Sequence, residues 1–173
     1  TGTREALLNA GEIFNPDFIA KIKMFKCLRF MVWLSTLGSY QTNWTDRPLQ
    51  NWVFWNDSLK YNQAFANATI VPIEVCVALC NKIGADGWFN IPLLATNDYA
   101  TQFATLVHST LSTSLKAYVE YGNENWNRGA YSSSLQTSVA SLGATQFPAL
   151  SSDAYSATWA YGVYRAVICG ALW

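Results

Sequence analysis

Helix-like and strand-like segments alternate along this chain, and this alternation limits its possible folds more than any other feature. Asn15 followed by Pro16 is typical of a helix start, and the apolar spacing after it predicts a helix over about 16–25. Further helices are predicted over 72–82, 97–111, 132–141 and 151–166. Short apolar or β-branched runs predict strands over 27–34, 86–92, 116–124 and 167–173. The first of these strands is expected to be buried on both faces.

Strict alternation of helices with short buried strands predicts right-handed crossovers and a parallel sheet. Four such units are half of an eight-stranded (β/α) barrel, and a complete TIM-type barrel needs about 250 residues. The 173 residues therefore predict one domain over 1–173, a partial barrel that is a fragment or a protomer completed by other chains. A small open α/β sheet is the competing architecture. The chain contains no glycine-rich nucleotide-binding motif.

Charge is scarce and balanced. Only 13% of the residues are charged, and 11 Lys and Arg cancel 11 Asp and Glu. This composition gives no electrostatic basis for binding nucleic acid or an anionic membrane, and no run of about 18 apolar residues predicts a membrane span. A secreted protein, or one that buries surface against partners, fits better. The absence of an initiator Met and the abrupt end on "AVICGALW" predict a fragment or a processed chain.

Cysteine and asparagine positions add two further expectations. The single histidine and the lack of a CxxC pair argue against zinc, so we expect no metal or cofactor. The four cysteines allow two disulfides or, equally, buried thiols: Cys27, Cys76, Cys80 and Cys169. Three N-x-[ST] sequons lie in one loop-like segment and are the predicted glycosylation sites: Asn43, Asn56 and Asn67.

A strand that ends on Asn123 and Glu124 is the most informative motif. The blocks "LRFMVW", "DGWFNIPLLATNDYATQFATLV" and "LKAYVEYGNENWN" resemble, in order and spacing, strands two to four of cellulase-like proteins. These proteins belong to the clan of retaining glycoside hydrolases built on (β/α)8 barrels. The resemblance covers about residues 15–170 and implies strands two to five of such a barrel.

The resemblance implies roles for particular residues. Glu124 matches the general acid/base of the clan, and Asn123 matches the residue that hydrogen-bonds the sugar 2-hydroxyl. Arg29 either supports the electrostatics of the site or forms a structural ion pair. Trp88 and Trp126 either offer flat faces to sugar rings or are core residues.

Other features depart from the pattern of active enzymes. Val32 and Leu93 stand where the clan carries an Asp and a His, and the strand with the catalytic nucleophile is not in the chain. Glu120 lies four residues earlier on the same predicted strand, roughly 13 Å from Glu124, and is therefore excluded as the partner in a retaining pair, which needs about 5–5.5 Å. Helix capping explains Asp98, and turn formation explains the loop residues Asp46 and Asp57.

Two functions follow from this reading. The favoured one is a secreted structural or carbohydrate-binding glycoprotein that binds polysaccharide or glycan and lacks the complete catalytic pair. Unpaired strand edges near 27–34 and 167–173 would allow it to self-associate, or to join the remaining half of a barrel. The alternative is an active retaining β-glycosidase, with Glu124 as acid/base and the nucleophile outside this chain.

Overall fold

The computed structural model describes residues 2–52, 55 and 70–173. In this part of the chain it contains six α-helices, three strands and three short 3₁₀ helices. The N-terminal half has α1 (Gly2–Asn9), α2 (Pro16–Ile22), β1 (Cys27–Arg29), η1 (Trp44–Asp46) and α3 (Ile73–Ile83). The C-terminal half has β2 (Asp86–Ile91), α4 (Asn97–Thr110), β3 (Ala117–Tyr121), η3 (Arg128–Ala130), α5 (Ser133–Gln146), η4 (Pro148–Leu150) and α6 (Ala154–Leu172).

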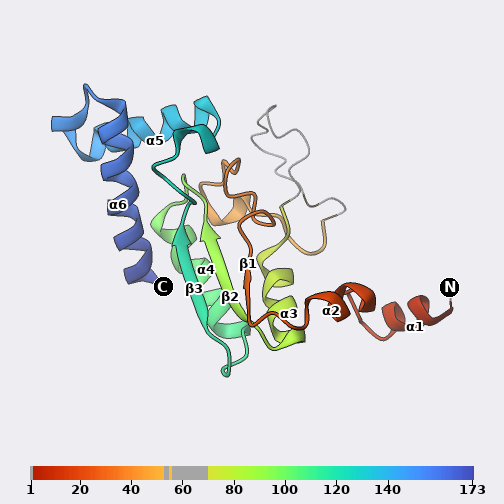
Figure 1. Cartoon of the computed structure of the whole chain (residues 1–173). Helices are drawn as coiled ribbons and strands as arrows, with labels where there is room; N and C mark the ends of the chain where they lie inside the picture. The colour runs from red at the N-terminus through yellow and green to blue at the C-terminus, as the bar shows by residue number, and fades with distance from the viewer. Residues whose placement is uncertain (1, 53–54, 56–69) are drawn as a thin grey trace.

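The strands form a parallel sheet in the order β1-β2-β3, as Figure 1 shows. Both pairings are parallel, and the carboxyl ends of the strands therefore meet at one edge of the sheet. Trp88 of β2 lies opposite Arg29 of β1 and Tyr118 of β3, and Asn90 lies opposite Glu120. The predicted parallel α/β architecture is confirmed at this level. No closed barrel is formed by the described residues.

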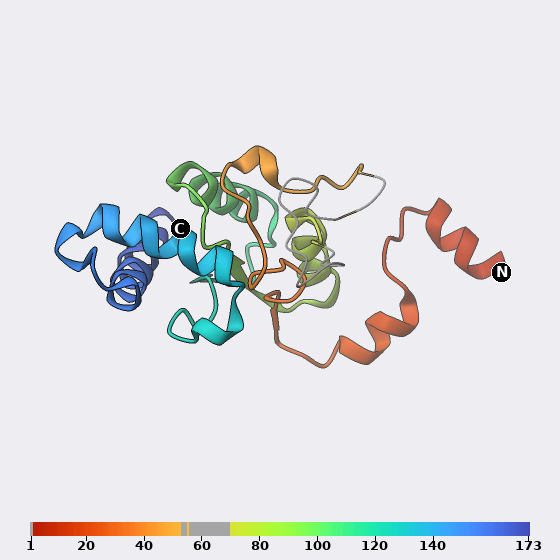
Figure 2. The same ribbon diagram turned by 90° about the horizontal axis from the view of Figure 1, so that it is seen from above.

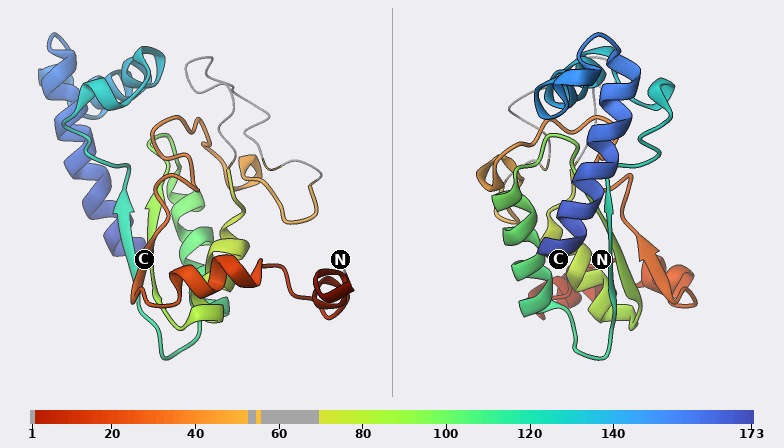
Figure 3. Two further views of the ribbon diagram at one scale, coloured as in Figure 1. Left: turned by 45° about the vertical axis from the view of Figure 1, so that its right-hand side comes forward. Right: turned by 90° about the vertical axis from the view of Figure 1, so that its left-hand side faces the viewer.

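The two faces of the sheet differ. Phe89 and Ile91 of β2 point into the core, where the ring of Phe89 stacks on Phe30 and packs edge-on against Phe103 of α4. Trp173, just after α6, also contacts Phe89, so α4 and the end of α6 lie on this face (Figure 3). Side chains alternate along a strand, so Trp88 and its opposite neighbours point the other way. That second face, which we call the open face, bears exposed side chains of all three strands.

Local sequence signals fixed several helix ends correctly. The Asn15 side chain accepts a hydrogen bond from the Asp17 backbone N–H, and Pro16 is the first residue of α2. Thr96 caps α4 through the Tyr99 N–H, and Gly84 ends α3 in the left-handed conformation. The predicted starts and stops of these three helices are confirmed within a few residues.

The strand predicted over 27–34 is shorter than expected. It ends at Arg29, and residues 31–38 form successive turns in which the Leu34 N–H bonds to the Phe30 carbonyl. Ser35 adopts a positive φ of 49° within these turns. The expected burial on both faces is also wrong, because Cys27 and Arg29 are exposed. Phe30 and Leu34 are buried by these turns and not by a strand, which accounts for the apolar character of the segment.

The strand predicted over 167–173 is helical instead. Residues 167–172 continue α6, a helix of 19 residues. The buried positions of α6 recur every three or four residues, which is the period of a helix face. The fourth strand is therefore absent, and the second free sheet edge is β3 instead of 167–173.

The remaining elements complete the outline. Viewed from above in Figure 2, α1 and α2 lie at the opposite end of the chain from α5 and α6. None of the described helices is both long and apolar enough for a bilayer crossing.

All four cysteines are free thiols; Cys27 is exposed, and the other three are buried. Burial raises the pKa of Cys80 to about 12 and that of Cys76 well above its usual value.

The close crossing of α5 and α6 depends on Gly143. A β-carbon at this position would overlap with the carbonyl oxygen of Ala157 in α6. We predict that Gly143→Ala lowers the free energy of unfolding by about 1–3 kcal/mol, because the two helices must move apart. Denaturant unfolding monitored by circular dichroism measures this change.

Gly170 provides the control within α6. Nothing lies within 4 Å of a β-carbon added there, so Gly170→Ala should stabilise the helix by about 0.5–1 kcal/mol. Equal effects of the two substitutions would contradict the proposed crossing.

Candidate functional site

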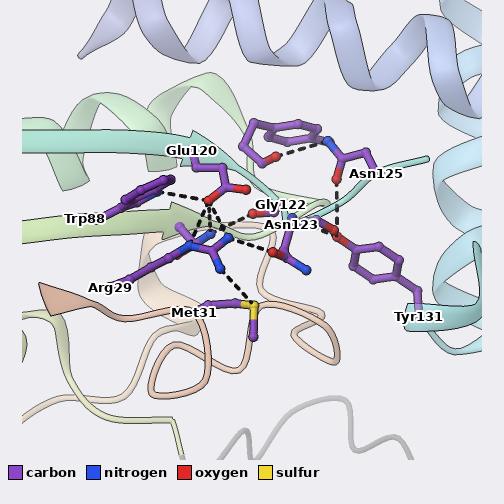
Figure 4. A network of polar contacts seen from close by, with 10 residues as sticks. Arg29, Met31, Trp88, Glu120, Gly122, Asn123, Asn125 and Tyr131 are labelled. Atoms are coloured by element: carbon purple, nitrogen blue, oxygen red, sulfur yellow. Dashed lines mark hydrogen bonds and ion pairs between the residues drawn. The ribbon is translucent and has the colours of Figure 1, made fainter. Parts of the chain in front are cut away.

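One carboxylate oxygen joins all three strands near their carboxyl ends (Figure 4). Glu120 Oε2 accepts hydrogen bonds from Arg29 Nη2 at 2.7 Å and Nε at 3.2 Å. It also accepts from Trp88 Nε1 at 2.9 Å and Asn90 Nδ2 at 2.9 Å. The Arg29 guanidinium lies 5.0 Å from the centre of the Trp88 ring. Arg29 therefore forms an ion pair, and this ion pair lies on the open face; a role of Arg29 in the electrostatics of a binding site stays a prediction.

Asn90 links this network to the end of β3. Its side chain is completely buried, and Nδ2 also donates to the Gly122 carbonyl at 2.8 Å. Gly122 follows β3 directly and has a φ of 64°, which glycine adopts without strain. Asn90 thus ties the turn after β3 to the charged pair on the open face.

Asn123 is held at both its backbone and its side chain. Its Oδ1 accepts a hydrogen bond from Arg29 Nη2 at 2.6 Å. Its backbone N–H donates to the Tyr131 hydroxyl at 2.8 Å, and this hydroxyl donates in turn to the Asn123 carbonyl. Burial, more than any other cause, raises the pKa of Tyr131 to about 12, and the negative charges of Glu120 and Glu124 contribute. The phenol therefore keeps the proton that it donates at physiological pH.

Glu124 lies at the rim of the site in a strained conformation. Its φ is 45°, in the left-handed region that residues with a side chain rarely adopt. The side chain is exposed, and Oε2 accepts a hydrogen bond from Asn127 Nδ2 at 3.2 Å. Strained backbone of this kind is concentrated at functional sites. The strand predicted over 116–124 ends at Tyr121, so Glu124 lies three residues beyond β3 and not on it, and its catalytic role stays a prediction.

Aromatic side chains surround the polar network. Trp126 is 60% exposed, and Trp88 and Tyr118 are 38% and 45% exposed. The alternative that Trp88 and Trp126 are core residues is therefore wrong. Tyr118 precedes Glu120 by two residues on the same face of β3. Large exposed rings beside charged and amide groups form a surface suited to a partly apolar, partly polar ligand.

Besides the buried Asn90 Oδ1, two polar atoms of the network have no partner among the described residues. Glu120 Oε1 receives no hydrogen bond, although Oε2 receives four, and Asn123 Nδ2 donates none. One atom is an acceptor and the other a donor. Arg29 fixes both side chains, since it contacts Glu120 and Asn123 through the same nitrogen. The pair is preorganised to bind hydroxyl groups.

The turn after β3 changes one expectation about spacing. The 13 Å estimate assumed that the strand continues to Glu124, but β3 ends at Tyr121 and the chain turns at Gly122. Because the chain turns between Glu120 and Glu124, the separation of the two residues no longer follows from strand length. Glu120 is nevertheless engaged by Arg29.

The two aliphatic residues that stand where the clan carries Asp and His, Val32 and Leu93, lie in different environments. Val32 is exposed, in the turns after β1, whereas Leu93 is buried, and its carbonyl accepts a hydrogen bond from Tyr121. Asp98 is in the first turn of α4, as expected for a residue at a helix start. The Asp46 carboxylate accepts from the backbone N–H groups of Thr42 and Asn43 and thereby closes a turn.

The structure describes one of the three sequon asparagines. Asn43 is exposed, and its glycosylation stays a prediction. Asn56, Asn67 and Asp57 lie outside the described residues. In the part of the chain that is described, no three His, Cys, Asp or Glu residues gather in a way that would hold a metal ion.

The sequence analysis did not identify Asn90 and Tyr131 as residues of the site, and it did not predict that Glu120 accepts hydrogen bonds from the neighbouring strands. A signal for the first and last was present. "WFNI" alternates, with Trp88 and Asn90 on one face, and "YVE" places Tyr118 and Glu120 likewise. Aligning the parallel strands would have set Asn90 beside Glu120. Nothing in the sequence pointed to Tyr131, which reaches the site across the loop after β3.

Comparisons of the chain with protein-family models, with curated proteins and with solved structures find no match in any of the three. The site must therefore be interpreted from its own geometry.

The strain at Glu124 leads to a prediction about stability. Replacing Glu124 by Gly should raise the free energy of unfolding by about 1 kcal/mol relative to Glu124→Ala, because only glycine relieves the left-handed backbone. Both variants lose the carboxylate and its bond from Asn127, so the comparison isolates the backbone. Equal midpoints of chemical unfolding for the two variants would show that residue 124 is unstrained.

Proposed function

We propose that this chain is a carbohydrate-binding protein on a glycoside-hydrolase-like α/β scaffold, and that its ligand is a β-linked polysaccharide or glycan. The observation that carries the proposal is the joint position of the Arg29–Glu120–Asn123 network and the exposed rings of Trp88 and Trp126. Arg29, Glu120 and Asn123 lie at or just beyond the carboxyl ends of parallel strands, Trp88 lies within β2 and bonds to Glu120, and Trp126 is five residues beyond β3. Ligands of α/β folds commonly bind at this edge.

The chemistry of the surface matches that of a sugar. Pyranose rings have apolar faces of C–H groups and a rim of hydroxyl groups. An exposed indole such as Trp126 covers the apolar face, and free Glu120 Oε1 and Asn123 Nδ2 accept from and donate to hydroxyls. The net charge of zero also suits an uncharged polysaccharide.

We favour a function in which this chain binds the polysaccharide without hydrolysing it. A retaining enzyme needs a nucleophile and an acid/base about 5–5.5 Å apart. Glu120 is the second carboxylate near Tyr131, and its charge is matched by Arg29. The strained Glu124 is the observation that favours the alternative of an active retaining β-glycosidase, with the nucleophile supplied from outside this chain.

Titration with cellohexaose and mannohexaose, followed by calorimetry and tryptophan fluorescence, tests the proposal. Trp126→Ala should weaken binding about ten-fold or more, since stacking of one ring contributes about 1.5 kcal/mol or more. Trp159→Ala is the matched control, because Trp159 is 44% exposed but lies on α6, away from the open face.

The outcomes separate the alternatives. No saturable binding of either oligosaccharide, or equal losses for the two variants, would overturn the proposal. Release of new reducing ends by the wild type and not by Glu124→Gln would replace it with the glycosidase.

We further propose that the open face is covered by a second copy of the chain. The face bears exposed Trp88 and Tyr118 between two free strand edges, β1 and β3, and such edges pair with other strands. A strongly basic or acidic partner is disfavoured, because the charges of Arg29 and Glu120 on the open face neutralise each other. Trp88, Arg29 and Glu120 belong to both surfaces, so the sugar and the second copy compete for the open face, and Trp126 lies beyond the end of β3.

Sedimentation velocity over a range of concentrations tests the association. We expect a concentration-dependent dimer or larger species that Tyr118→Lys shifts toward monomer. Val163→Lys should have no such effect, because Val163 is exposed on α6. A wild-type chain that stays monomeric throughout would contradict the proposal.

A further inference from the structure

A second concave surface lies away from the open face. It is a groove of about 870 Å³ lined by the loop between β2 and α4, by α5 and by α6. Figure 3 shows α6 beside the sheet and α5 beyond the carboxyl ends of the strands. Its volume falls within the range of small-molecule sites, about 300–1,000 Å³. None of the residues proposed to bind sugar lines it.

Arg165 of α6 is a buried cation at the wall of this groove. Its side chain is 5% exposed, and Nη1 and Nη2 donate to Asn97 Oδ1 and the Ala95 carbonyl. The Nε atom has no hydrogen-bond partner among the described residues, and no carboxylate there forms an ion pair with Arg165. The nearest compensation is the Tyr121 ring, 5.7 Å away. A buried guanidinium with only neutral partners is costly unless an anion comes close.

The N-terminus of α4 meets the same groove. This helix has 14 residues, and Thr96, Asn97 and Asp98 all line the groove. The Thr96 hydroxyl satisfies the Tyr99 N–H, but the N–H groups of Asn97 and Asp98 make no hydrogen bond within the described structure. Free N–H groups and the positive end of the helix dipole are the usual elements of an anion site.

Asp98 is the only acidic residue lining the groove, and it opposes anion binding. Its carboxylate is exposed, in the first turn of α4, and forms no salt bridge in the described residues. The opposite wall is formed in part by hydroxyl side chains of α5, including Thr137, Ser138 and Ser141. The Thr137 and Ser138 hydroxyls already donate to the Ser133 and Ser134 carbonyls, so they can accept hydrogen bonds from the rest of a small polar ligand.

We propose that this groove binds the oxyanion group, phosphate or carboxylate, of a small ligand. The anion is held by the Asn97 and Asp98 N–H groups and compensates the charge of Arg165. This site is independent of the sugar-binding surface, so either can fail without the other.

Amide NMR of the full chain tests the proposal, with inorganic phosphate and acetate as probes and chloride at matched ionic strength as reference. We expect saturable shifts of the Asn97 and Asp98 amides with at least one probe. A glucose phosphate ester and glucuronate, added in separate titrations, distinguish a phosphate from a carboxylate ligand by which of the two binds more tightly than its free ion.

Three variants make the test specific. Asp98→Asn should tighten binding about two- to five-fold, because a like charge is removed from the helix N-terminus. Asn97→Pro removes one N–H donor at a position where proline suits a helix, as Pro16 does in α2. It should bind more weakly than Asn97→Ala, which loses the side chain but keeps the N–H. Absence of saturable shifts, or unchanged affinity in Asp98→Asn together with equal affinity in the two Asn97 variants, would overturn the proposal.

Discussion

The parallel register between β2 and β3 is the constraint on which the rest of the site depends. It sets Asn90 opposite Glu120 and Trp88 opposite Tyr118, with Arg29 completing the row from β1. A shift of β2 by one residue would turn Trp88 and Asn90 toward the helices and bring Phe89 and Ile91 to the open face. The burial of Phe89 among aromatic rings of α4 and of residues 30 and 173 opposes such a shift. The apolar face therefore determines the geometry of the polar one.

Much of the fold could be read from the sequence, and the two errors have physical causes. Helix ends were accessible because Asn15, Thr96 and Gly84 carry local signals. Residues 30–34 and 167–173 were misassigned because short apolar runs look alike whether turns, a helix or a strand bury them. In the second case the helical spacing of Thr158, Arg165 and Cys169 was present in the sequence. It was obscured by the β-branched and apolar residues at the chain end.

The site was predicted less completely, and the reason is different. Asn123, Glu124 and Arg29 were found because they belong to a resemblance that spans three blocks of sequence. Asn90 and Tyr131 act through contacts between elements, and no local pattern encodes such contacts. Tyr131 bonds to both backbone groups of Asn123 from a segment after η3. Only the folded structure shows that Glu124, with its strained backbone, comes directly after a residue whose backbone N–H and carbonyl are both hydrogen-bonded to Tyr131.

The distribution of thiols has a consequence for how the chain meets oxidants and alkylating agents. Reaction requires the thiolate, and burial holds the pKa of Cys76 and Cys80 far above physiological pH. Cys169 is shielded in the same way, so Cys27 alone is accessible in the folded state. Each molecule thus has one accessible thiol at the edge of its sheet, whose pKa is itself raised by partial burial and the charge of Asp86, and the other three thiols become available only when the core opens.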